Sequence, residues 1–340
     1  MNQARGIARR YIFRHGRCWV AAMGMLAAAH GQTCQGGSDM DPQQRTAIET
    51  TAKRYFDMAA RGDSSALQQA SISALTANFS GIETAVKDNQ AAFSQAEMTQ
   101  RSVYLLAAEG NEPLARAEFL CGVFGASGQT SGSSILVFHN LPPGKYAVAV
   151  LDAKKAQDAR ILTMVLQQVG ADWKLAGFYA RPSLVDGHDA AWFAQRARDF
   201  KAKGQTHNAW LYFRQAITLT APADFVSTLA TDKLYDEAQS VQPSDLPVNG
   251  STMELSGGGI NYIITSIFPM AVGNDLDLVV RYQAADVSDT YKTFQANTAM
   301  MKALLTKFPE FRDAFIGVVA RAVEPSGRDY GSMLPMKEIK

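Results

Sequence analysis

The sequence has few of the residues that hold metals or build a disulfide framework. Its 340 residues include three cysteines and five histidines. Neither Cys-x-x-Cys nor His-Glu-x-x-His occurs, so no zinc site is predicted. The signatures of a phosphate-binding loop and of a serine nucleophile elbow are also missing. We therefore predict no catalytic residue, metal site or cofactor from motifs. An acid–base pair built from distant positions stays open.

Acidic residues are missing from the N-terminal end, where the first one is Asp39. Five arginines lie between Arg5 and Arg17, followed by an apolar run at 18–29 and the small-residue site Ala29-His30-Gly31. This order is typical of a secretory signal, and the run is shorter than the roughly 20 apolar residues of a membrane span. We predict a signal peptide over 1–31 and a periplasmic or extracellular protein. The route of export, general or twin-arginine, stays open.

Beyond residue 31 the chain lacks both a strong charge of one sign and a long apolar run. Removal of the leader would leave 309 residues and change the formal net charge from +1 to about −4. A nearly neutral chain offers no electrostatic reason to bind nucleic acid. No later run is long enough to span a bilayer. We predict no nucleic-acid partner and no membrane span after signal removal.

Two cysteines, Cys34 and Cys121, lie beyond the predicted leader. In an oxidising compartment such a pair can form a disulfide. This bridge would join the mature N-terminus to a predicted strand. The alternative is two unpaired thiols, and the sequence leaves both open.

The first folded region is predicted over 41–182. Residues 32–40 are rich in Gly, Gln and Ser and predict a flexible lead-in. Asp41-Pro42 is a helix start, and apolar residues at helical spacing continue as far as Gly62. A second helix is expected over 82–93. Six strands separated by turn signals follow at 101–107, 114–124, 134–138, 146–152, 160–169 and 173–181.

The order of two predicted helices followed by a strand meander is similar to that of a known superfamily. Its last hairpin has Trp173 after the turn and Gly177-Phe178-Tyr179 on the final strand, and Tyr55-Phe56 precedes Gly62-Asp63 at the end of the first helix. This region resembles the cone-shaped superfamily of nuclear-transport-factor-two-like proteins, which includes steroid isomerases and SnoaL-like cyclases. The resemblance implies a curved sheet that wraps a long helix and leaves a pocket.

Three residues are candidates for that pocket. Glu118 and Asp152 lie on predicted strands and could pair, as carboxylates do in the steroid-isomerase relatives. His139 ends a strand and could act as a base, because an unperturbed imidazole titrates near neutrality. The residues themselves favour the simpler alternatives, which are surface carboxylates and a solvated loop histidine.

Residues 188–240 predict a helical segment. Six residues fall at tetratricopeptide spacing: Ala197, Phe200, Gly204, Ala209, Phe213 and Ala216. The segment resembles a single tetratricopeptide repeat, a family used for protein contacts, and a third helix is expected over 224–240. Trp192 and Trp210 lie on the two repeat helices as candidate partner-binding residues, since aromatics dominate interface hot spots. Contact with flanking domains is the alternative.

After a linker, residues 250–340 predict a small domain. Strands are expected at 260–267 and 276–282, a helix over 286–307, and strands at 315–323 and 329–336. The fold class is therefore α+β. It combines a cone-like helix-plus-curved-sheet domain, a tetratricopeptide-like hairpin with one extra helix, and a small β-β-α-β-β domain.

Together these patterns predict an exported, non-catalytic protein that binds another envelope or secreted protein. An export signal, a repeat type used for protein contacts and the missing catalytic motifs support this interpretation. The alternative is a small-molecule binder, or an isomerase- or cyclase-like enzyme, that uses the cone pocket.

Overall fold

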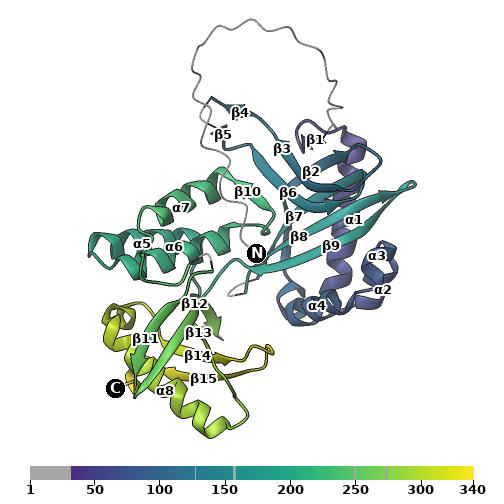
Figure 1. The fold of residues 1–340 in the computed structure, drawn as a ribbon. Helices are drawn as coiled ribbons and strands as arrows, with labels where there is room; N and C mark the ends of the chain where they lie inside the picture. Colours follow the sequence, from purple (N-terminus) through teal and green to yellow (C-terminus); the bar gives the residue numbers. More distant parts are fainter. Residues whose placement is uncertain (1–31, 127, 156–157, 249, 273–274) are drawn as a thin grey trace, which may run out of the picture. The chain divides into compact units, whose positions relative to one another are not determined.

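The computed structural model describes residues 32–126, 128–155, 158–248, 250–272 and 275–340 (Figure 1). The predicted leader lies outside these residues. The fold is mixed α+β, as the sequence predicts. The chain divides into two compact units, each described separately. Unit 1 contains residues 32–155, 161–180 and 222–229, and unit 2 contains 158–160, 181–221 and 230–340.

The helices of unit 1 pack on a sheet through the face that the sequence predicts. They are α1 (Pro42–Ala60), α2 (Ser64–Gln69), α3 (Ser73–Thr76) and α4 (Ser80–Phe93). The Asp41 carboxylate accepts the backbone N–H groups of Gln43 and Gln44, which confirms the expected helix start. The α1 side chains that point to the core are Ile48, Ala52, Tyr55, Phe56 and Ala59.

Unit 1 contains two main sheets and a short ribbon. The larger sheet has the order β1 (Gln32–Gly36), β2 (Glu97–Ala108), β7 (Gly144–Lys154), β8 (Arg160–Val169) and β9 (Asp172–Pro182). The smaller sheet has the order β10 (Val226–Thr228), β6 (Ser134–Leu141) and β3 (Leu114–Cys121). The ribbon pairs β4 (Phe124–Gly125) with β5 (Gly128–Gln129).

The larger sheet is the middle layer of unit 1. On β7, Ala149 and Leu151 belong to the core shared with α1 and α4, whereas Val148 and Val150 belong to the core shared with β3 and β6. Successive side chains of a strand point to opposite faces, so β7 must be apolar on both. This explains its continuous apolar run.

The expected flexible lead-in is wrong for residues 32–36, which form strand β1. β1 pairs antiparallel with β2, and Cys34 lies opposite Leu106. The Gly- and Gln-rich sequence has little strand propensity of its own. Strand β1 forms because its backbone hydrogen-bonds to the edge of β2, and this pairing is not visible in the local sequence.

Of the two alternatives left open for Cys34 and Cys121, the structure shows the disulfide. Cys34 and Cys121 are bonded, with their Cα atoms 5.0 Å apart, and are separated by 87 positions in the sequence. Because Cys34 lies on β1 and Cys121 on β3, the bridge joins the two main sheets of unit 1.

The helix expected over 224–240 begins later than predicted. Residues Val226–Thr228 form β10, which pairs antiparallel with β6, and α7 (Leu229–Gln239) follows directly (Figure 1). The free edge of β6 provides the pairing that overrides helix formation there. The chain therefore returns to unit 1 for one short strand.

Unit 2 combines helices with a second five-stranded sheet. Its first helices are α5 (Ala190–Ala202), α6 (Thr206–Thr220) and α7. The sheet has the order β11 (Met253–Gly257), β12 (Ile260–Val272), β13 (Asp275–Gln283), β14 (Gly317–Val323) and β15 (Asp329–Pro335). Helix α8 (Thr290–Lys307) connects β13 to β14, which are parallel, and two short helices, η1 (Pro309–Asp313) and η2 (Met336–Glu338), complete the unit. The sequence does not predict β11.

Helix α8 is fixed to this sheet by a buried polar network. The side-chain amide of Asn297 donates to Ser332 Oγ at 2.8 Å, and its oxygen accepts from the Tyr282 hydroxyl at 2.7 Å. Tyr262 Oη donates to the carbonyl of Ala296 at 3.1 Å. Because buried polar groups need partners, these bonds select one position of α8 on the sheet.

Candidate functional site

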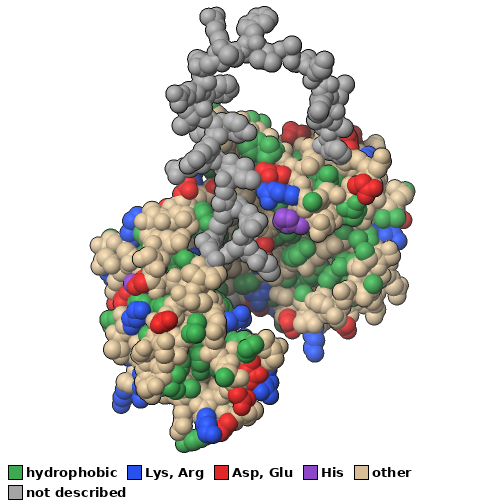
Figure 2. Space-filling view, in the orientation of Figure 1, with side chains coloured by type: hydrophobic (Ala, Val, Ile, Leu, Met, Phe, Trp, Pro, Cys, Tyr) green, Lys and Arg blue, Asp and Glu red, His purple; other side chains and the backbone are tan. Residues whose placement is uncertain are grey.

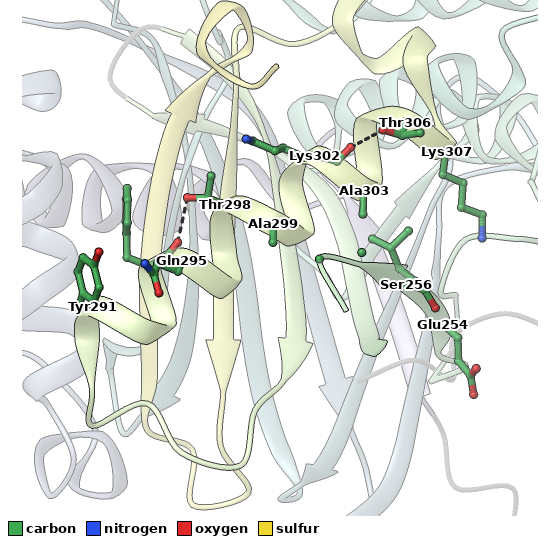
Figure 3. A pocket seen from close by; sticks show the side chains of 14 residues that line it. Glu254, Ser256, Tyr291, Gln295, Thr298, Ala299, Lys302, Ala303, Thr306 and Lys307 are labelled. Carbon is green, nitrogen blue, oxygen red and sulfur yellow. Dashed lines mark hydrogen bonds between the residues drawn. The ribbon is translucent and has the colours of Figure 1, made fainter. Parts of the chain in front are cut away.

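The site candidate is a groove in unit 2 between β11 and α8 (Figure 3). Its volume is about 1000 Å³. Strand β11 and the turn after it form one wall, and one face of α8 forms the other. Within the described residues no helix is long and apolar enough to cross a membrane, and no cluster of His, Cys, Asp and Glu is arranged to hold a metal ion.

The β11 wall is an open sheet edge. Among the described residues only β12 pairs with β11, through the register Leu255 to Tyr262 and Gly257 to Ile260. The two-residue turn Gly258-Gly259 has φ of 61° and 79°, typical of a type I′ hairpin. In such a hairpin the residues next to the turn exchange hydrogen bonds and the next pair does not. The backbone N–H and C=O groups of Glu254 and Ser256 therefore point away from β12.

The two walls of the groove, β11 and α8, approach each other closely at one end. A Cβ added to Gly257 would lie 2.4 Å from Ala303 Cβ, and one added to Gly258 would lie 3.0 Å from Ala299 Cβ. These distances leave no room for a side chain on either glycine. The small residues on both elements therefore let the strand and helix backbones approach closely and fix the end of the groove.

The charges at the groove are mostly positive and lie on the helix. Lys302 and Lys307 are exposed and have no ion pair with any described residue, and the Lys307 ammonium lies 5.3 Å from the Phe308 ring centroid. Glu254 accepts a long hydrogen bond from Asn261 at 3.4 Å, and Figure 3 shows its carboxylate directed away from α8. Elsewhere on the visible face, acidic and basic side chains are interspersed (Figure 2).

Two aromatic side chains lie at the beginning of α8. Tyr291 is 70 % exposed and Phe294 is 41 % exposed, and both line the groove. Large apolar side chains that stay exposed beside a groove are typical of interaction sites. The groove thus combines unpaired backbone groups, two cations and an apolar end.

The structure separates the three predicted pocket residues of unit 1. Glu118 on β3 pairs with Arg116 at 3.0 Å, and Asp152 on β7 pairs with Arg101, whose Nε lies 3.1 Å from Oδ2. His139 on β6 is exposed. The structure places the two carboxylates on different sheets, each with its own arginine, so it does not bring them together.

Aromatic side chains fill the space between the helices and the larger sheet of unit 1. The Phe56 and Phe93 rings are 5.5 Å apart, and the Phe93 and Phe178 rings are 6.4 Å apart. Trp173 and Tyr55 are also buried in this core, and Tyr55 Oη donates to the carbonyl of Trp173 at 2.8 Å. The pocket implied by the cone resemblance is packed at this place.

The two predicted partner-binding tryptophans differ in exposure. Trp210 is buried in the core of unit 2, and the Arg214 guanidinium lies 4.8 Å from its ring. Trp192 is 38 % exposed and stacks on His188 with ring centroids 3.7 Å apart. Only Trp192 presents surface to a partner.

Unit 2 also contains a histidine held by two carboxylates. His207 Nδ1 lies 2.7 Å from Glu310 Oε1, and Nε2 lies 2.9 Å from Asp245 Oδ1. Its ring packs 4.8 Å from Phe308. These contacts join α6, the segment after α7 and η1, which is a structural arrangement rather than an open site.

The groove residues are absent from the sequence-based candidates, although a signal for them exists. The run Gly257-Gly258-Gly259 is a turn signal. Met253 and Leu255 alternate with polar residues before it, which is the pattern of a half-buried strand leading into a hairpin. The edge position of β11, by contrast, follows only from the sheet order.

The fold and site define a two-unit α+β protein with one disulfide between sheets and an open strand edge beside a helix. Comparison with family models, with curated proteins and with solved structures found no match to this chain. The function is therefore argued from the groove itself.

Proposed function

We propose that this chain is an exported, non-catalytic protein that binds another envelope or secreted protein through the groove between β11 and α8. The observation that carries the proposal is the open edge of β11 beside an exposed helix face. Unpaired strand edges pair readily with other chains, and native proteins usually protect them. An edge left open in a groove is consistent with a partner that covers it.

Two observations support export. The first 31 residues have the order of a secretory signal, and the Cys34–Cys121 disulfide is of a kind that persists in oxidising compartments. The proposal places the protein in the periplasm or outside the cell.

The finer fold assignments are part of the same proposal. A cone-like origin of unit 1 is supported by the long helix α1 and the final hairpin that carries Trp173. A single tetratricopeptide-like hairpin is supported by α5 and α6, where Ala197, Phe200, Ala209 and Phe213 are buried. The alternative function, a ligand-binding or isomerase- or cyclase-like cone pocket, has less support because Phe56, Phe93 and Phe178 occupy that space.

Site-specific photocrosslinking in the native host tests the proposed function. A photoreactive amino acid replaces Thr298 or Thr306 in the groove, and Lys337 serves as an exposed position outside it. We expect one protein to be captured from both groove positions and not from Lys337. Capture of no protein specific to the groove positions contradicts the proposal.

A further inference from the structure

We infer that the partner of the groove is an extended, acidic peptide segment that adds to β11 as a sixth strand of the unit 2 sheet. This inference rests on the proposed function, because it names the form and charge of the partner bound there. It follows from three features of the groove: its backbone groups, the small side chains of its helix wall and its charge.

The backbone groups of β11 suit a strand and not a helix. Glu254 and Ser256 each present an N–H and a C=O outward, about 7 Å apart as alternate residues of a strand. An extended peptide presents donors and acceptors at the same spacing. A helical partner has its backbone groups bonded internally and cannot satisfy them. Strand addition is a recurrent way in which sheet edges recognise peptides.

The helix wall leaves space for such a strand. The α8 residues that face the groove next to β11 are small, namely Thr298, Ala299, Ala303 and Thr306. A strand added to a sheet lies about 4.8 Å from its neighbour, so its alternate side chains would point toward this face of α8. The exposed rings of Tyr291 and Phe294, which also line the groove, would contact apolar side chains of the added strand.

The charges select an acidic segment. Lys302 and Lys307 line the groove and have no acidic partner among the described residues. The carboxylate of Glu254 points away from α8 and is bonded to Asn261 (Figure 3). An Asp or Glu on the α8 side of the added strand would therefore be attracted by both lysines, and the Glu254 carboxylate would not repel it. A basic segment would be repelled there.

Selection of phage-displayed random linear peptides on the purified exported protein tests this inference. Ser256→Pro removes an outward N–H while leaving the ladder to β12 intact, and proline is tolerated on edge strands. Ser256→Ala keeps the N–H and removes only the side chain, so it is the matched control. We expect the selected peptides to be acidic and rich in β-branched residues. Their affinity should fall by about tenfold or more in S256P, and should be retained in S256A.

A charge reversal provides the second arm. In the variant with Lys302→Glu and Lys307→Glu the selection should shift from acidic to basic peptides, whereas Lys337→Glu, outside the groove, should change nothing. Thermal unfolding midpoints of all variants are measured to confirm that the fold is unchanged. Selected peptides that are helical, that ignore S256P, or that keep their charge preference in the double variant overturn the inference, and so does selection of no peptide. Groove-specific photocrosslinks that persist in S256P would overturn strand addition alone and leave the proposed function standing.

Discussion

At the residue scale, two carboxylates of unit 2 have pKa values shifted in opposite directions. Burial raises the pKa of Asp277, which is 3 % exposed on β13, and the Asp275 carboxylate adds to this effect, whereas the Gly317 N–H opposes it. Hydrogen bonds from Arg198, at 2.7 and 2.8 Å, lower the pKa of Glu237. The environment of each group therefore decides how it responds to pH.

Asp277→Asn is expected to be more stable than the wild-type protein by an amount that increases as the pH rises. An acid whose pKa is raised in the folded state contributes stability below its unfolded pKa and loses it as the pH rises through the folded value. Asparagine can still accept from the Gly317 N–H but carries no charge. Thermal unfolding followed from about pH 4 to about pH 7 should show a midpoint difference that grows in favour of the variant. A constant difference would contradict this assignment.

Glu237→Gln should show the opposite dependence on pH. Because the pKa of Glu237 is lowered, its contribution is present above the ordinary glutamate pKa and is lost as the pH falls through the folded value. The side chains of Arg198 and Glu237 are 45 % and 36 % exposed, so we expect a loss below about 1 kcal/mol at neutral pH. The loss should disappear in acid, when measured by denaturant unfolding.

At the element scale, the close contact between β11 and α8 requires a residue without a side chain on the strand. Gly257 has no side chain where a Cβ would lie 2.4 Å from Ala303 Cβ. The position of β11, and with it the open edge of the groove, follows from this close approach. The sequence analysis predicts the helix here, but neither strand β11 nor its contact with α8.

Gly257→Ala should destabilise unit 2 by about 1–3 kcal/mol through overpacking. Ala303→Gly should itself reduce stability by about 1 kcal/mol, because glycine is a poor helix former. If the contact is as described, the double variant is less destabilised than the two single effects added together. A double-mutant cycle by urea unfolding measures this coupling, and strictly additive effects would rule the contact out.

Element boundaries show where sequence reasoning succeeds. Strands β8 and β9 and helices α1 and α8 follow the predicted ranges within a few residues, because their apolar periodicity and capping residues are local. β1 and β10 were predicted as flexible chain and helix. Both are short, lack a strong strand pattern, and exist because a neighbouring strand edge accepts them. The groove was missed for the same reason.

At the scale of the whole molecule, the disulfide and the predicted leader are both typical of a protein in an oxidising compartment. The Cys34–Cys121 bond closes a long loop in unit 1 and joins its two main sheets. Such a bond persists where the surroundings are oxidising, and the leader is the predicted means of reaching them. The proposed export would therefore carry the protein to surroundings in which the bond persists.

Cys34→Ser combined with Cys121→Ser should lower the stability of the folded protein by about 2–5 kcal/mol, because the open chain gains conformational entropy on unfolding. Reduction of the wild-type protein should give a similar shift in the urea midpoint. The double variant itself should not respond to reductant, which is the control. A wild-type protein indifferent to reductant would show that the bridge does not form.

Mass spectrometry of the exported protein should find its N-terminus near Gln32, as the small-residue site predicts. An N-terminus at Met1 would refute the predicted cleavage. Replacement of Arg9 and Arg10 by lysine separates the two routes, because only twin-arginine export depends on that pair. Processing that continues in this variant would indicate the general route.

The sequence by itself determined the α+β class, most of the helices and strands, the predicted leader and the two cysteines available for pairing. These follow from local periodicity, capping and composition, which need no knowledge of distant residues. Only the tertiary structure decided that Cys34 bonds Cys121, that Glu118 and Asp152 have separate arginine partners, and that β11 is an edge strand beside α8. Each of these depends on contacts between residues far apart in the chain, and such contacts leave no periodic signal in a single sequence.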